Sequence, residues 1–152
     1  MGKITATATV LMFGGAVSAA MADRVNVASD ANVARSVERL NTAVEAAGAR
    51  VFTTVDFQRG AASVGEELRP TTVVIFGSPK IGSAALQEGQ TMALYLPLRI
   101  LFFEDENGQT WATYDEPTAI AASHGLSANN AAVLQMKAAL ARFSSVATGG
   151  GM

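Results

Sequence analysis

Alternation of apolar and polar positions predicts five strands, at residues 24–28, 51–57, 71–76, 98–103 and 109–114. The run 71–76 is unbroken in its β-branched and apolar character, which predicts a central strand covered on both faces. In the run 98–103, Leu98, Ile100 and Phe102 share one face. Asn107-Gly108 predicts a tight hairpin between the last two strands, with both turn residues at positive φ.

Helical periodicity separates these strands. A stripe of Val33, Val37, Leu40 and Val44 predicts an amphipathic helix that Ser29 or Asp30 caps and Gly48 ends. Weaker patterns predict helices at 59–68, from Ser78 to about Glu88, and from about Thr118 to Gly125. Ser127 is expected to cap the last helix, which carries Val133, Met136, Leu140 and Phe143 on one side. We expect an α+β domain over residues 23–148, with a small, mostly antiparallel sheet and helices packed on it, and a flexible tail at 149–152.

The amino end has the pattern of a secretory signal. Lys3 is followed by an uncharged stretch with an apolar core at 10–13, and Ala20-Met21-Ala22 forms a small-residue cleavage motif before Asp23. We therefore interpret residues 1–22 as a signal peptide, which places the mature domain in the periplasm or outside the cell. The alternative is a strand in the alternating threonine and alanine residues at 5–10. Once the signal is removed, we expect no stable membrane insertion.

The composition of the chain argues against nucleic-acid binding and excludes sites that need cysteine. The chain has 152 residues, 49% apolar content and a formal charge of −2, without a cluster of Lys and Arg that could neutralise many phosphates. We therefore expect no nucleic-acid partner. The absence of cysteine excludes disulfides, thiolate metal sites and a cysteine nucleophile.

His124 is the only histidine and hence the only side chain with an ordinary pKa near neutrality. It could ligate a metal or haem, or act as an acid or base. The alternative is a structural histidine at a helix C-terminus before Gly125. Met92 and Met136 could complete a haem axial pair, although Met136 also fits the core stripe of its helix. Haem binding is therefore a hypothesis, and no metal set is predicted.

Two further groups of residues are candidate ligand contacts. Ser78 and Lys80 flank Pro79 where a helix begins, so they could hold an anion, or simply form a capped turn. Asp56, Tyr114 and Asp115 lie near predicted strand ends, where two carboxylates could perform acid–base chemistry if they met. No Gly-x-Ser-x-Gly elbow and no Walker loop is present, so the pattern does not favour covalent catalysis or nucleotide binding.

Several motifs together resemble the bacterial domain-of-unknown-function family 302. They are Val55-Asp56, Glu67-Leu68-Arg69-Pro70-Thr71, Ile75-Phe76-Gly77-Ser78-Pro79-Lys80, Leu96-Pro97-Leu98 and the segment 111–117, with 55–118 the most specific region. The resemblance implies a compact α+β domain, often dimeric, without an agreed activity. Two positions depart from the family pattern: Phe57 stands where a histidine commonly follows the aspartate, and Ser78 replaces an asparagine. His124 falls where the family often has a histidine.

We expect a domain that binds a ligand or a partner and performs no catalysis of its own. A site would lie near the turn at 77–80 and the segment 114–124. The aromatic strand residues exceed what one small helical layer covers, which predicts a homodimer; they are Phe76, Phe102, Phe103, Trp111 and Tyr114. The alternative is a haem- or metal-binding redox accessory protein, or an enzyme that uses His124 with a carboxylate such as Asp115.

Overall fold

The computed structural model describes residues 23–150, so the expected signal peptide at 1–22 and the last two residues of the expected tail lie outside the described part. Five strands form one antiparallel sheet in the order β1-β5-β4-β3-β2. Their bounds are Arg24–Ala28 for β1, Arg50–Asp56 for β2, Thr71–Gly77 for β3, Leu98–Glu104 for β4 and Thr110–Asp115 for β5. The expected α+β class and the antiparallel sheet are confirmed.

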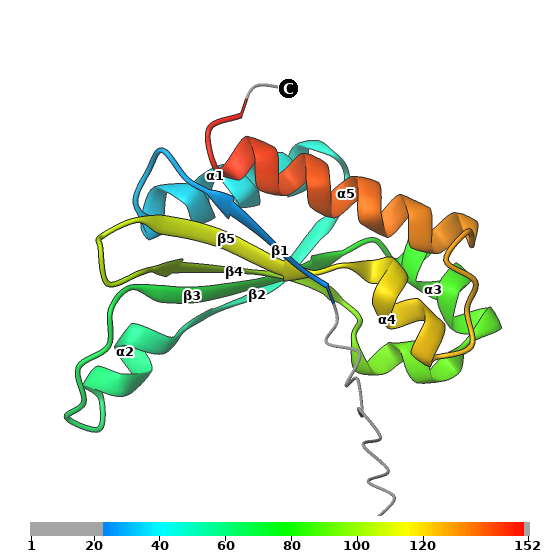
Figure 1. Cartoon of the computed structure of the whole chain (residues 1–152), viewed down its shortest axis with the longest axis horizontal. Helices are drawn as coiled ribbons and strands as arrows, with labels where there is room; N and C mark the ends of the chain where they lie inside the picture. The colour runs from blue at the N-terminus through cyan, green and yellow to red at the C-terminus, as the bar shows by residue number, and fades with distance from the viewer. Residues whose placement is uncertain (1–22, 151–152) are drawn as a thin grey trace, which may run out of the picture.

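The two longest helices lie on the same face of the sheet (Figure 1). These are α1, Val33–Ala46, and α5, Ala131–Ala147, and they pack against each other as well as on the strands. Shorter helices occupy the connections: α2 at Phe57–Ala62, α3 at Pro79–Glu88, the 3-10 helix η1 at Gln90–Leu94 and α4 at Pro117–Ser123. In Figure 1, α3 and α4 gather at one end of the sheet, beneath the N-terminal half of α5.

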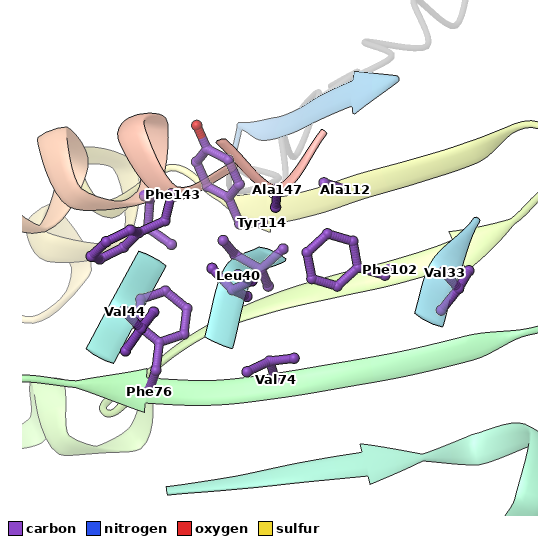
Figure 2. Close-up of a cluster of buried hydrophobic side chains, with 12 residues drawn as sticks. Val33, Leu40, Val44, Val74, Phe76, Phe102, Ala112, Tyr114, Phe143 and Ala147 are labelled. Carbon is purple, nitrogen blue, oxygen red and sulfur yellow. The ribbon is translucent and has the colours of Figure 1, made fainter. Parts of the chain in front are cut away.

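The core forms between this helical layer and the strands (Figure 2). Leu40 and Val44 of α1 are fully buried, as are Val74 of β3 and Phe102 of β4. The α5 stripe predicted by periodicity is buried, and the Phe143 ring meets the Phe76 ring edge to face at 5.5 Å. A second cluster joins α3, α4, η1 and α5 around Met92 and Met136.

Four local predictions are wrong: the coverage of β3, the type of the hairpin turn, the alternation in β2 and the helix N-caps. The face of β3 opposite the helices is only partly buried at Val73 and Ile75, so this strand is central but not covered on both faces. In the hairpin only Gly108 has positive φ, at 78°, since the Asp105 carboxylate accepts the backbone N–H groups of Asn107 and Gln109 and holds a different turn.

A bulge between Val51 and Thr53 breaks the strict alternation predicted for β2. Val51 pairs with Phe76 on the helical side, whereas Thr53 pairs with Ile75 on the open side. The helix N-caps also differ from the prediction. Asn32 caps α1 instead of Ser29 or Asp30, and Asn130 caps α5 instead of Ser127. Both asparagine side chains accept hydrogen bonds from the first helical turn, which is the requirement for a cap.

Candidate functional site

A partly open cavity of about 590 Å³ lies between α3, α5 and one end of the sheet. The turn after α1 and the start of β2 form one wall, with Gly48 and Phe52. The end of β3 and the first turns of α3 form another wall, and η1 with the entry to β4 closes the third side. Residues of α5 complete it, among them Met136, Ala139 and Phe143. This volume lies within the range of about 300–1,000 Å³ that is usual for small-molecule sites.

Small side chains create this space. Eight lining positions are glycine or alanine: Ala47, Gly48, Ala49, Gly77, Gly82, Ala93, Ala138 and Ala139. At Gly82, a Cβ atom would meet only Leu96, at 4.0 Å, so this part of α3 has open space in front of it. Sequence analysis missed the cavity, because these residues are spread over several elements and each has an ordinary local reason in a turn or a helix.

The cavity has few polar groups. Its lining includes one charged residue, Arg142 of α5, and two hydroxyls, those of Ser78 and Ser83, while the remainder is apolar, glycine or proline. No aspartate or glutamate belongs to the described lining. The wall chemistry therefore suits a largely apolar molecule.

The turn that sequence analysis selected borders this cavity. Ser78 takes the N-cap position of α3, but its side chain makes no capping hydrogen bond, which corrects the expectation that it caps the helix. Pro79 follows at the first helical position, where its lack of an N–H is tolerated. The backbone N–H groups of Ile81 and Gly82 donate to the Ser78 carbonyl oxygen. Lys80 is exposed and is not part of the lining.

His124 lies elsewhere, at the C-terminal end of α4. It occupies the C-cap position before Gly125, whose φ is 78°. Its Nδ1 lies 2.9 Å from the Thr91 hydroxyl, and its ring is tilted against Tyr95 with the centroids 5.1 Å apart. These contacts fasten α4 to η1, so the environment of His124 matches that of a structural helix terminus.

The other candidate residues are distributed over separate places. Tyr114 is buried in the main core (Figure 2). Asp115 faces the open side of the sheet, where its Oδ1 lies 3.8 Å from Nε of Arg24 in a solvent-exposed ion pair. Asp56 caps α2 by accepting the backbone N–H of Arg59 at 2.9 Å. The structure therefore does not bring these three residues and His124 into one acid–base group.

The described part of the chain contains no cluster of side chains that could hold a metal ion. No three histidine, aspartate or glutamate side chains cluster within residues 23–150. Met92 and Met136 are fully buried in the second hydrophobic cluster. In that cluster they fill space between helices, the role that the apolar stripe of its helix favoured for Met136.

The comparison with protein families gives a match to the model described as "Domain of unknown function DUF302", over residues 25–143. Among solved structures, the fold is similar to the crystal structure of an uncharacterized conserved protein DUF302 from Bacillus stearothermophilus. The TM-score is 0.74 at 17% identity, and the match covers 82% of this chain and 97% of the other. At that identity, the likeness supports the fold alone.

Curated relatives carry a different name. The chain is 39% identical over 102 residues to a protein named fluoride-specific ion channel FluC 1 from Brucella suis, and equally to FluC 2 from Brucella melitensis. The match covers 67% of this chain but only 40% and 38% of those proteins. Within residues 23–150, no helix combines the length and hydrophobicity needed to cross a bilayer.

Proposed function

The chain belongs to the DUF302 family of domains of unknown function, and we propose that it is a binding domain that takes up a small, largely apolar molecule without catalysing a reaction. The observation that carries the proposal is the cavity between α3, α5 and the sheet. A well-formed apolar cavity with a few polar groups is the usual form of a small-molecule site. The candidate acids and bases are distributed over separate elements, which favours binding over catalysis.

A neutral fluorescent probe tests this proposal. N-phenyl-1-naphthylamine gains fluorescence in an apolar environment, so the full chain should raise its emission in a saturable manner. The Gly82→Phe variant should abolish the gain, because the new ring would enter the open space before α3. Gly82→Ala is the matched control and should retain binding. Equal probe binding by wild type and Gly82→Phe, with both folded by circular dichroism, would reject the cavity as the site.

The relatives support a modular role. A segment similar to this chain forms about two fifths of longer proteins named for fluoride transport. We propose that what the chain shares with them is a binding module and not the channel activity in their name. A fluoride efflux assay in vesicles reconstituted with this chain should therefore give no flux above that of empty vesicles.

We also propose a homodimer in which the open face of the sheet meets its copy. This face combines partly buried apolar side chains, including Leu101 and Phe103, with charged groups at both ends. Arg99 and the Arg24–Asp115 ion pair lie toward one end and Asp105 at the other. When two copies pack with their strands antiparallel, Arg99 of one would lie over Asp105 of the other. That charge complementarity favours a second copy over an unrelated partner.

Light scattering tests the dimer. Wild-type protein should keep a dimeric mass across a tenfold dilution, whereas Leu101→Lys should be monomeric because it places an unpaired charge on the apolar face. Val64→Lys is the matched control, since Val64 is 75% exposed and lies outside this face. A monomeric wild type would reject the proposal.

Export through residues 1–22 is a separate proposal, supported by the charge, apolar core and cleavage motif of that segment. Expression of the full chain in a Gram-negative host should yield a periplasmic product whose amino terminus is Asp23. A product that retains Met1 and stays with the cytosolic fraction would reject it.

A further inference from the structure

We infer that the ligand of the cavity carries a planar aromatic ring system, and that Phe52 determines this specificity by packing its ring against the ring of the ligand. This inference rests on the proposed binding function and adds the chemical class of the ligand. It follows from the way in which β2 places Phe52 at the cavity and from the other rings that line the wall.

Phe52 reaches the cavity because of the bulge in β2. Val51 pairs with Phe76 and Thr53 pairs with Ile75, which are neighbours in β3, so Phe52 is the extra residue of the bulge. In a regular strand, Phe52 would point to the open face of the sheet, because Val51 before it lies on the helical side. A bulge can re-aim a side chain, and Phe52 instead lines the cavity on the helical side.

The Phe52 ring keeps much of its surface accessible. It is 47% exposed, which is unusual for a large apolar side chain that lines a cavity. Its Cε2 atom lies beside Gly77 at the end of β3, where a Cβ atom would be 3.7 Å away. The ring therefore rests against the backbone on one side, and a ligand in the cavity would cover apolar surface that is now in contact with water.

Two further aromatic rings belong to the cavity wall, those of Phe76 from β3 and Phe143 from α5. They meet edge to face, with their planes at 85°. Aromatic rings favour edge-to-face and offset contacts with one another, and these contacts stabilise a complex beyond the effect of buried area. A saturated ligand of similar size would bury comparable area without this additional term, so the described lining favours an aromatic ligand.

The polar part of the wall fits one small polar substituent on such a ligand. The hydroxyls of Ser78 and Ser83 lie in the lining, and the Ser78 side chain does not cap α3. A hydroxyl group can both donate and accept a hydrogen bond, so it can pair with a ligand hydroxyl in either sense. A fused aromatic ring system with one hydroxyl group is therefore a suitable test ligand.

Matched ligands separate this inference from the proposed function. The compounds 2-naphthol and decahydro-2-naphthol share one carbon skeleton and one hydroxyl group, and they differ in that only the first is aromatic and planar. Each is titrated into the full chain at about neutral pH, and its affinity is measured by isothermal titration calorimetry. We expect wild type to bind 2-naphthol at least about threefold more tightly, a factor within the range that aromatic pairs supply beyond burial.

Variants assign the preference to Phe52. Phe52→Leu should weaken 2-naphthol by about threefold or more and leave decahydro-2-naphthol within about twofold, because leucine keeps an apolar side chain and removes the ring. Phe52→Tyr should retain the preference. Phe57→Leu is the matched control, since Phe57 is also 47% exposed but lies outside the cavity lining. Gly82→Phe should weaken both compounds.

The outcomes are distinct. If the compounds bind and Gly82→Phe blocks them, but 2-naphthol has no advantage or Phe52→Leu keeps that advantage, the aromatic inference is wrong and the cavity proposal stands. If neither compound binds, or Gly82→Phe leaves both affinities unchanged, the cavity proposal fails and the aromatic inference fails with it.

Discussion

The indole Nε1 of Trp111 donates a hydrogen bond to Oδ2 of Asp105 over 2.9 Å, across the hairpin that joins β4 and β5. The other carboxylate oxygen, Oδ1, accepts the backbone N–H groups of Asn107 and Gln109, each at 2.9 Å. The Asp105 carboxylate therefore fixes both the hairpin turn and the Trp111 side chain on the open face of the sheet.

This arrangement predicts a dependence of stability on pH. The Trp111 hydrogen bond and then the backbone hydrogen bond from Gln109 lower the pKa of Asp105 below its ordinary 3.8. Because the folded pKa is the lower one, the stabilisation is present above the unfolded pKa and is lost as pH falls through the folded value. Urea unfolding at about pH 7 and about pH 3 should give a larger difference for wild type than for Asp105→Asn. An unchanged difference would contradict this assignment, and Glu106→Gln is the neighbouring control.

Gly89 permits a close approach between two connections. A Cβ atom at this position would lie 2.7 Å from the carbonyl oxygen of His124 and would overlap the Leu126 side chain. Gly89→Ala should lower the free energy of unfolding by about 1–3 kcal/mol, the usual effect of overpacking. Gly60→Ala is the control, because a Cβ there meets nothing within 4 Å and Gly60 is helical. Equal stability of the two variants by urea unfolding would contradict the packing described.

We expect His124 to stabilise the fold and to take no part in ligand binding. Its contacts with Thr91 and Tyr95 join α4 to η1, so His124→Ala should lower the unfolding temperature and leave the affinity for N-phenyl-1-naphthylamine unchanged. Thr91→Val, which removes the partner hydroxyl, should destabilise in the same direction. A Soret shift on adding hemin that wild type shows and His124→Ala lacks would instead revive haem binding.

The main core should respond strongly to truncation. Leu40 is fully buried between α1 and the strands, so Leu40→Ala should destabilise the fold by about 2–5 kcal/mol through lost burial and the cavity left behind. The exposed Leu94 serves as control, since Leu94→Ala removes a side chain that is 74% accessible. Similar urea midpoints for the two variants would contradict the core assignment.

Local periodicity was sufficient where one element carries its own signal. The stripe from Val133 to Phe143 predicted the buried side of α5, and Ile100 with Phe102 predicted the inward side of β4. The motif around Gly77-Ser78-Pro79 led to the family, and the start of α3 lies where proline favours it. The turn of the hairpin was predicted in place but not in type, because the Asp105 side chain outweighs the preference of Asn107-Gly108.

The sequence by itself determined the five strands, the two long helices and the family, because hydrophobic period and short motifs act over a few neighbouring positions. Only the tertiary structure decided which face of the sheet stays open and that eight small residues from distant segments leave a cavity beside Arg142. It also placed Ser78 at the cavity, His124 beside Thr91 and Asp115 beside Arg24, whereas the sequence had led us to expect one site near residues 77–80 and 114–124. A cavity and the neighbours of a charged residue depend on contacts between segments that are far apart in sequence. They therefore leave no pattern among neighbouring residues from which they could be predicted.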